Sequence, residues 1–429
     1  MIKVTTVILA AGKSTRFKGP KSKLLQELAG LPIICHVVNA AKKISGQDVI
    51  IVCNKNNIKD LKLLIKDCKF VIQKNQKGTA DAINSAKKLI KQKNLLILFG
   101  DVPLLSIQTI KKLIFNFKKN NSLASMLAFT TLNPYGYGRI KLKKNKILKV
   151  IEEINANNEE KKITICNSGI MLVNSNVFFK NLDLIKINKI NKEKYLPDIF
   201  EIYSKNNNPF SFIISPEDEM HGVNTLSDFI NVDNILQKKL IKNFIDKGVL
   251  ISKPETCFFS FDTIVEKGVI IEQNVTIKNN VKIKSGTLIK SNSYIEGAKI
   301  EKNCIIGPFA RIRPSSLICK NSKIGNFVEV KNSIIGEKSS ISHLSYIGDS
   351  SIGKNVNIGA GTITCNFDGK IKNKTIIKEG SFIGSNCSLV APLVINKNVK
   401  IGAGSVITQD IPSNNLAIER SQLKIIKKK

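Results

Sequence analysis

The first half of the chain alternates short apolar runs with amphipathic segments. Val4–Leu9 is typical of a buried strand, and a glycine-containing turn follows it. Further strands are predicted at Val49–Cys53, Lys69–Gln73 and Leu95–Phe99, and helices at Leu31–Lys42, Lys59–Lys66 and Ala80–Lys91. This alternation predicts an α/β domain with a Rossmann-like, mostly parallel sheet. Ligands of such sheets bind where the strands end, here in the loops after Leu9, Gln73 and Phe99.

The pattern changes from about Phe259, where an aliphatic residue returns at every sixth position. The series begins at Val265–Ile295, continues with one-residue slips to Ile358, and resumes over Ile377–Ile407. A period of six fits neither a helix nor a single strand. It predicts a parallel β-helix in which each unit forms one side of a triangular coil. A chance arrangement in an isoleucine-rich chain would not hold this register. The interruption at Thr362–Thr375 is predicted to leave the solenoid as a loop.

A helix-like segment, Leu226–Ile245, separates the two patterns. We therefore predict a first domain over residues 1–225, a linker helix over 226–246 and a β-helix domain over 247–429. A chain of 429 residues is too long for one ordinary core, which agrees with two domains.

Lys and Arg exceed Asp and Glu by 34, which invites a nucleic-acid interpretation. The lysines are spread over the whole chain, however, so no nucleic-acid partner is expected, and the charge suits anionic small substrates equally well. The nine cysteines form no C-x-x-C pair and are expected to be mostly buried free thiols. No segment has the character of a signal peptide or a membrane span, so we expect a cytoplasmic protein with no membrane partner.

Small residues follow the first strand in the run Leu9-Ala10-Ala11-Gly12-Lys13-Ser14-Thr15-Arg16. The run is not a P-loop, because Val7 stands where a Walker A motif requires glycine. Small residues nevertheless allow backbone N–H groups to approach an anion, and Arg16 and Lys23 add positive charge. The sequence therefore predicts a phosphate site in this loop.

The chain has three histidines. His36 lies in an apolar helical stretch and is expected in the core, and His221 can simply pack beside the Gly222-Val223-Asn224 loop. His343 lies inside the solenoid, in a region with other polar residues. A neutral imidazole can accept a proton, so His343 is a candidate general base.

These motifs together resemble one family. The N-terminal motifs resemble those of the sugar-nucleotide pyrophosphorylases. They are the run Leu9–Arg16, Gln73 and Gln76 before Gly78-Thr79, Phe99-Gly100-Asp101, Tyr137-Gly138-Arg139 and Asn167-Ser168-Gly169. With the hexapeptide domain, the chain resembles the bifunctional N-acetylglucosamine-1-phosphate uridyltransferase/glucosamine-1-phosphate acetyltransferase family over nearly its whole length. The resemblance implies an enzyme of UDP-N-acetylglucosamine synthesis, which supplies peptidoglycan and lipopolysaccharide precursors.

The resemblance implies roles for N-terminal residues. Asp101 and Asn224 would hold Mg²⁺, while Arg16 and Lys23 would stabilise the phosphates. Gln73 offers an amide donor and acceptor to a uracil edge, and Glu152 and Asn167 would hold sugar hydroxyls. The expected nucleotide-sugar site comprises Leu9, Ala10, Ala11, Gly12, Lys23, Gln73, Gly78, Thr79, Phe99, Gly100, Asp101, Gly138, Glu152, Asn167 and Asn224.

The resemblance also implies an acetyl-transfer site on a left-handed β-helix. His343 would be the general base that deprotonates the amine of glucosamine-1-phosphate, and no acyl-enzyme is expected. Glucosamine-1-phosphate would bind to Arg313, Lys331, Tyr346 and Asn357. Acetyl-CoA would bind to Ala360, Asn366, Phe367, Ser385, Ala403 and Arg420. Fold analogy implies a homotrimer with acyl-transfer sites between chains.

Four positions depart from the family pattern. Ser22 precedes Lys23 where proline is usual, Lys194 and Pro197 are unusual in their segment, and Phe367 replaces a tyrosine. Three alternatives stay open: a monofunctional nucleotidyltransferase with a structural β-helix, a nucleotide-sensing scaffold, and a nucleic-acid binder. The combination of Arg16, Lys23, Asp101 and Asn224 argues against a scaffold, and His343 argues against a purely structural β-helix.

Overall fold

The computed structural model describes residues 2–143, 146–188, 192–421, 423 and 425–426. The chain divides into two compact units between Ile235 and Leu236, within helix α8 (Leu226–Asp246). The boundary lies inside the segment predicted as a linker helix, residues 226–246.

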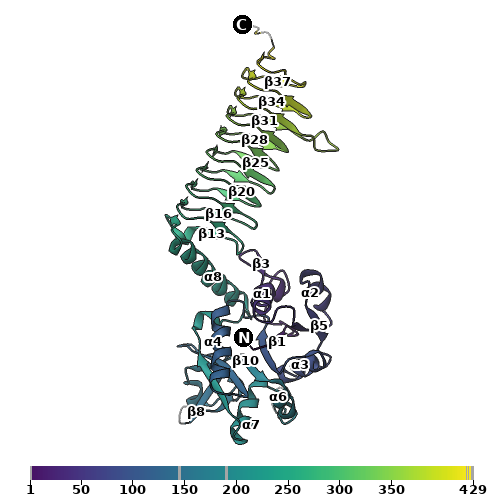
Figure 1. The fold of residues 1–429 in the computed structure, drawn as a ribbon, viewed down its shortest axis with the longest axis vertical. Helices are drawn as coiled ribbons and strands as arrows, with labels where there is room; N and C mark the ends of the chain where they lie inside the picture. Colours follow the sequence, from purple (N-terminus) through teal and green to yellow (C-terminus); the bar gives the residue numbers. More distant parts are fainter. Residues whose placement is uncertain (1, 144–145, 189–191, 422, 424, 427–429) are drawn as a thin grey trace. The chain divides into compact units, whose positions relative to one another are not determined.

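A nine-stranded mixed sheet forms the centre of the first unit (Figure 1). Strands β6 (Asn94–Phe99), β1 (Val4–Leu9), β4 (Val49–Cys53) and β5 (Lys69–Ile72) are parallel. On the other side of β6 the order continues with β10 (Ile165–Asn174), β7 (Ala124–Thr130) and β11 (Phe210–Ile214). Strand β10 is antiparallel to β6 and to β7, and β11 is parallel to β7. The hairpin of β8 (Gly138–Lys143) and β9 (Lys146–Ile151) pairs with β10. The expected mostly parallel arrangement thus holds for the half of the sheet that the sequence analysis covered.

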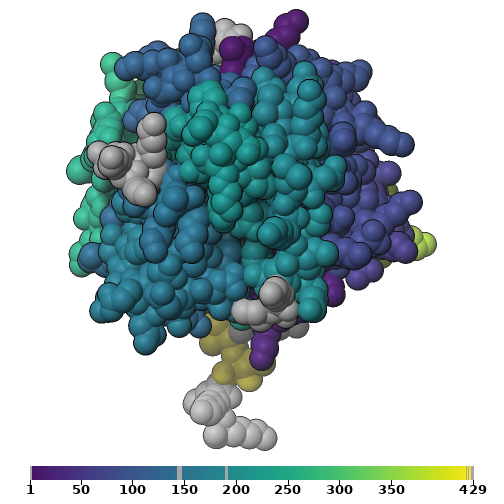
Figure 2. Space-filling model, turned by 90° about the horizontal axis from the view of Figure 1, so that it is seen from below, coloured from purple at the N-terminus to yellow at the C-terminus, as the bar shows by residue number. Residues whose placement is uncertain are grey.

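Helices cover both faces of this sheet because its strands are apolar on both sides. On one face Ile8 packs with α1 (Ile33–Ser45) and α4 (Ile107–Lys119). On the other face Val7 packs with α3 (Thr79–Ala86), α6 (Ser175–Leu182) and α7 (Ile199–Lys205). A shorter helix, α2 (Ile58–Leu64), follows β4. Figure 2 shows one face of this unit, where blue to teal segments form most of the visible surface.

Two predicted helix boundaries are wrong. Leu31 and Pro32 form a short strand, β3 (Leu31–Pro32), which pairs with β2 (Glu27–Leu28), so α1 begins only at Ile33. The helix predicted to end at Lys91 ends earlier: α3 stops at Ala86 and a 3₁₀ turn (Lys87–Leu89) follows. Helix ends are set by backbone hydrogen bonds that periodicity does not report.

The second unit is a three-sided parallel β-helix of very short strands. Face 1 runs from β12 (Leu250–Ile251) to β38 (Leu416–Ala417), and face 2 from β13 (Phe258–Phe259) to β37 (Val406–Ile407). Face 3 runs from β14 (Ile264–Val265) to β35 (Leu393–Ile395). The sixth-position aliphatic residues point inward and form one continuous core, as the period predicted.

The loop that leaves the solenoid is shorter than predicted. Strand β31 (Ile363–Cys365) lies within the expected interruption but belongs to face 2, and the coil resumes at β32 (Thr375–Ile377). The excursion between them is visible near the label β31 in Figure 1. It closes through a backbone bridge between Phe367 and Lys372.

All nine cysteines are free thiols, five of them buried and four partly exposed, in agreement with the sequence. Within the described ranges, no helix combines the length and apolarity that a bilayer crossing requires.

Candidate active sites

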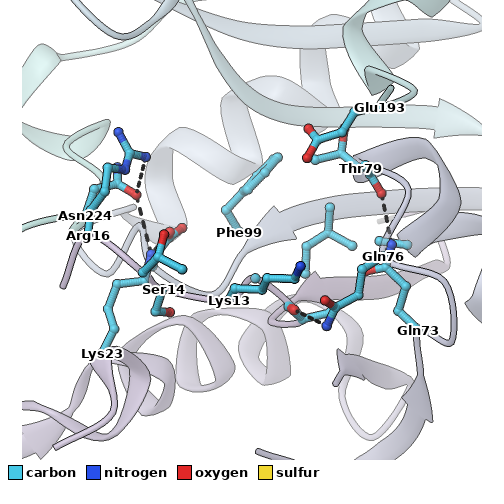
Figure 3. A pocket seen from close by; sticks show the side chains of 17 residues that line it. Lys13, Ser14, Arg16, Lys23, Gln73, Gln76, Thr79, Phe99, Glu193 and Asn224 are labelled. Carbon is cyan, nitrogen blue, oxygen red and sulfur yellow. Dashed lines mark hydrogen bonds and ion pairs between the residues drawn. The ribbon is translucent and has the colours of Figure 1, made fainter. Parts of the chain in front are cut away.

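A cavity of about 550 Å³ opens where β1, β5 and β6 end, as the sheet topology predicted. Figure 3 shows a charged end with Arg16, Lys23 and Asn224 and an amide end with Gln73 and Gln76. Eleven of the expected residues line it: Leu9, Ala11, Gly12, Arg16, Lys23, Gln73, Gly78, Thr79, Phe99, Asp101 and Asn224. Ala10, Gly100, Gly138, Glu152 and Asn167 do not.

Two asparagines hold the turn after β1. Asn57 donates from Nδ2 to the carbonyl of Ala10 at 2.7 Å, and Asn54 donates to the carbonyls of Ala11 at 3.1 Å and Gly12 at 3.5 Å. Asn54 is 8% exposed, and its Oδ1 accepts hydrogen bonds from two following backbone N–H groups. These contacts occupy carbonyl oxygens of the turn and fix its backbone beside the cavity. Neither asparagine was among the predicted site residues.

Carboxylate, amide and ammonium groups meet at the charged end. Lys23, only 8% exposed, places Nζ 2.5 Å from Oδ2 of Asp101 and 3.5 Å from Oδ1 of Asn224. Arg16 donates to the same Asn224 oxygen at 3.4 Å. The backbone N–H of Val223 donates to the carbonyl of Asp101 at 2.9 Å, so the two oxygen-bearing residues lie on loops that are tied together.

The start of α8 positions Asn224. The backbone N–H groups of Asn224 and Thr225 both donate to Oδ2 of Asp228, at 2.9 and 2.8 Å. The hydroxyl of Thr225 accepts in return from the N–H of Asp228 at 3.1 Å. This reciprocal capping satisfies the helix N-terminus and fixes the residue that precedes it.

The charged end fits a magnesium ion. One carboxylate oxygen and one amide oxygen already contact a common cation, the Lys23 ammonium, and Mg²⁺ prefers such oxygen ligands. Among the described residues no three His, Cys, Asp or Glu side chains converge as a metal cluster. An ion held by Asp101 and Asn224 would therefore complete its shell with water and phosphate oxygens, which is typical of Mg²⁺.

Gln73 can offer a ligand its amide oxygen as an acceptor, but not the amide donor that was also predicted. Its Nε2 donates to the carbonyl of Gly78 at 3.0 Å and to Oδ2 of Asp81 at 2.8 Å. Both amide hydrogens are therefore used within the protein. Gln73 is 5% exposed and lines the cavity, so its oxygen is the group that remains for a ligand that donates a hydrogen bond.

Gly138, Glu152 and Asn167 lie together on the β8–β9–β10 side of the sheet. Asn167 is opposite Gly138 in the strand pairing, and a Cβ at Gly138 would lie 3.2 Å from Oε1 of Glu152. Gly169, two residues after Asn167, lies against the Phe99 ring, which lines the cavity. A Cβ at Gly169 would lie 2.5 Å from that ring, and its φ of +79° also favours glycine. Burial and the charge of Asp198 raise the pKa of Glu152 to about 7.

Two of the departures from the family pattern fit the local backbone. Ser22 has φ −52° and ψ 138°, which a proline ring also permits, so the chain enters the Lys23 turn as it would with proline. Pro197 lies in the first turn of a 3₁₀ helix (Leu196–Asp198), where no N–H is required.

In the β-helix, His343 is exposed at the corner between faces 1 and 2, which we call the first corner. Its Nδ1 lies 2.5 Å from Oδ1 of Asn326. Ala360, Ser385 and Ala403 occupy the same corner in the following coils, and Arg420 donates to the carbonyl of Ala403 at 2.9 Å. Four residues expected to bind acetyl-CoA thus lie in one column with His343. His36, in contrast, is buried and bonded to the carbonyl of Leu28 at 3.1 Å, as a core histidine should be.

The other expected residues lie elsewhere on the same unit. Arg313 and Lys331 are at the ends of face 2 strands, and Arg313 pairs with Glu329 at 2.7 Å. Asn366 and Asn332 both donate to Asp349 at this second corner, between faces 2 and 3. Tyr346 begins β28 (Tyr346–Gly348) and Asn357 begins β30 (Asn357–Ile358). Phe367 is 60% exposed in the excursion.

Sequence reasoning missed several residues of the cavity. Lys13, Ser14 and Thr15 belong to the motif but were not assigned to the site, and Gln76 donates to the carbonyl of Ala11 at 3.3 Å. Glu193 reaches the cavity because its neighbour Lys194 pairs with Lys77 through the backbone. Only tertiary structure could reveal that last contact.

A nucleotide-sized polar cavity on an α/β sheet, followed by a hexapeptide β-helix, defines a two-domain transferase. Residues 6–164 match the family described as MobA-like NTP transferase domain, and residues 297–332 and 374–409 match bacterial transferase hexapeptide repeats.

Curated relatives extend the match to the whole chain. The bifunctional protein GlmU of Bartonella bacilliformis is 39% identical over 422 residues, which cover 97% of this chain and 94% of the relative. GlmU of Agrobacterium fabrum is 38% identical over 429 residues, with 98% and 93% covered. GlmU of Buchnera aphidicola subsp. Schizaphis graminum is 39% identical over 430 residues, with 95% and 92% covered. The chain belongs to the GlmU family, which confirms the predicted family, the fold class and the assignment as a bifunctional transferase.

Proposed function

We propose that the first unit transfers UMP from UTP to N-acetylglucosamine-1-phosphate and releases pyrophosphate. The observation that carries this proposal is the convergence of Lys23, Asp101 and Asn224 at one end of a cavity whose other end presents the Gln73 oxygen. The N3–H of uracil would donate to that oxygen. Glu152 and Asn167, beyond Phe99, would receive the sugar hydroxyls.

Charge neutralisation is the main task of this site. The attacking sugar-phosphate oxygen is already anionic, so no general base is needed, and the barrier is the approach of two polyanions. Lys13, Arg16 and Lys23 supply positive charge around the cavity. Magnesium, held by Asp101 and Asn224, would add charge at the phosphates. The fixed turn after β1 would orient backbone N–H groups toward the same anion.

For the second unit we propose acetyl transfer from acetyl-CoA to glucosamine-1-phosphate. His343 is exposed on a rigid strand end, so its imidazole can accept a proton from the attacking amine. The column of Ala360, Ser385 and Ala403 would carry the extended cofactor. Arg313 and Lys331 would bind the sugar phosphate.

A homotrimer assembled through the first corner accounts for an exposed apolar ladder there. Phe309, Phe327 and Leu344 follow one another in successive coils and are 46%, 55% and 61% exposed, and the two rings stack at 5.0 Å. All three have left-handed φ angles of 50–55°, which are costly for such residues. At the equivalent positions the other coils hold residues that tolerate this conformation: Asn274, Asn292, Gly361, Asn386 and Gly404. Strain and exposure together favour a neighbouring chain at this corner, beside His343.

Two measurements test these proposals. The purified protein should release pyrophosphate from UTP with N-acetylglucosamine-1-phosphate, with a requirement for Mg²⁺, and should release CoA from acetyl-CoA with glucosamine-1-phosphate. Absence of CoA release would leave the monofunctional alternative. We expect a cytoplasmic enzyme that sediments as three chains of 47.4 kDa. Phe309→Asn with Phe327→Asn should dissociate it, and an unchanged trimer would refute the corner assignment.

A further inference from the structure

Asn326 and His343 occupy equivalent positions in successive coils. Strands β24 (Lys323–Asn326) and β27 (Ser340–His343) pair in parallel with Asn326 opposite His343. The Asn326 amide oxygen lies 2.5 Å from Nδ1 of His343. An amide oxygen can only accept, so Nδ1 must carry the hydrogen of this bond. In a neutral imidazole, Nε2 is then the nitrogen with the lone pair.

The backbone around this pair is also fixed. The N–H of Leu344 donates to the carbonyl of Asn326 at 3.0 Å, and the Ser345 hydroxyl donates to the carbonyl of His343 at 2.8 Å. Both side chains therefore project from strand ends that the solenoid holds in register. A ring that is placed this way has its orientation determined by the side chain one coil before it.

We propose that Asn326 is a positioning residue for acetyl transfer, because it holds His343 in the tautomer and orientation in which Nε2 accepts the proton of the amine. This inference rests on the proposed function of the second unit. In the step it serves, the amine nitrogen bonds to the thioester carbon, the carbon–sulfur bond breaks, and Nε2 takes an amine proton. The resulting imidazolium returns that proton to the departing thiolate, so charge and atoms balance.

On the adjoining strands and around the same corner the titratable side chains are Lys323 on β24, Glu329 and Lys331 on β25 (Glu329–Lys331), and Tyr346 on β28. Strand β30 carries none. Glu329 is paired with Arg311 and Arg313, so the neutral amide of Asn326 is the partner bonded to Nδ1.

The tautomer can be read without any assay of activity. The full-length protein with ¹⁵N-labelled histidine gives only three imidazole pairs, and His343→Gln assigns the one of interest. The wild type should show Nδ1–H and an unprotonated Nε2 at alkaline pH. In Asn326→Ala the signals should move toward the mixed tautomers of a free imidazole. A wild-type spectrum dominated by Nε2–H would overturn the proposal.

Kinetics separate positioning from structure. We expect Asn326→Ala to lower kcat for acetyl transfer about 10- to 100-fold with little change in the KM for the amino sugar. Asn326→Asp keeps an acceptor and should recover most of kcat, while its carboxylate favours imidazolium and moves the acid limb of the pH profile to higher pH. The matched control is Asn292→Asp, on the same corner three coils before His343 and roughly 14 Å from it, where the same charge should leave the profile unchanged.

Two results would overturn the role of Asn326: an unchanged kcat in Asn326→Ala, or an Asn326→Asp variant as slow as Asn326→Ala with an unshifted profile. Full acetyl-transfer activity in His343→Ala would instead refute the proposed function of the second unit. The histidine spectrum would still show whether the Asn326–His343 pair exists, so the two failures are distinguishable.

Discussion

Glu152 is predicted to lower the stability of the first unit at neutral pH. Burial and the nearby Asp198 raise its pKa from 4.5 to about 7, whereas the unfolded chain should keep an ordinary value. Between these two values the unfolded state has lost the proton and the folded state still binds it, so the free energy of unfolding falls as pH rises. The loss is complete above about pH 7. At 1.36 kcal/mol for each pKa unit, it reaches about 3 kcal/mol.

The test is Glu152→Gln, which keeps the shape of the side chain and removes its charge. The variant should match the wild type near pH 4.5 and become more stable by up to about 3 kcal/mol near pH 8, which is about 6–12 °C in Tm for a unit of this size. Calorimetry of the full chain at several pH values measures this. Glu159→Gln, at a side chain 81% exposed, is the control and should change little. An equal gain at both pH values, or a loss near pH 8, would refute the reasoning.

Three further predictions concern the first unit. Asn54→Ala should raise the KM for UTP about tenfold, because the turn after β1 loses two hydrogen bonds, and it should leave acetyl transfer normal. The control Asn56→Ala, at an exposed residue, should keep a normal KM, and an unchanged KM in Asn54→Ala would contradict the prediction. Arg139→Met should lower the free energy of unfolding in urea by about 3 kcal/mol, because it removes the 2.5 Å ion pair between Glu153 and a side chain that is only 2% exposed. Equal stability of variant and wild type would show that this ion pair does not stabilise the unit. Gln73→Leu should reduce the preference for UTP over CTP, measured as the ratio of kcat/KM values, because only uracil donates from N3; a retained preference would place uracil recognition elsewhere.

Sequence patterns predicted the elements that periodicity controls. The six-residue repeat identified the β-helix and its inward side chains, and the small residues after Leu9 pointed to a loop that lines the cavity. The same repeat could also have found Asn326, which precedes His343 by one coil. The backbone angles that make the Phe309–Phe327–Leu344 ladder unusual are visible only in the structure.

Contacts between distant segments could not be predicted in the same way. Asn54 and Asn57 follow β4 and hold a turn more than forty residues earlier, a contact that exists only because β1 and β4 are neighbours in the sheet. The double use of the Gln73 amide likewise depends on Asp81 in the first turn of α3. The start of α1 was misplaced because Leu31 and Pro32 pair with β2, and the end of α3 was misplaced because a 3₁₀ turn follows Ala86.

We expect one chain to carry two independent sites, one built around Asp101 and one around His343. The most direct measurement is the pair of activities in the two reciprocal variants. Asp101→Ala should lose uridylyl transfer and retain acetyl transfer, and His343→Ala should do the reverse. Loss of both activities in either correctly folded variant would contradict the account.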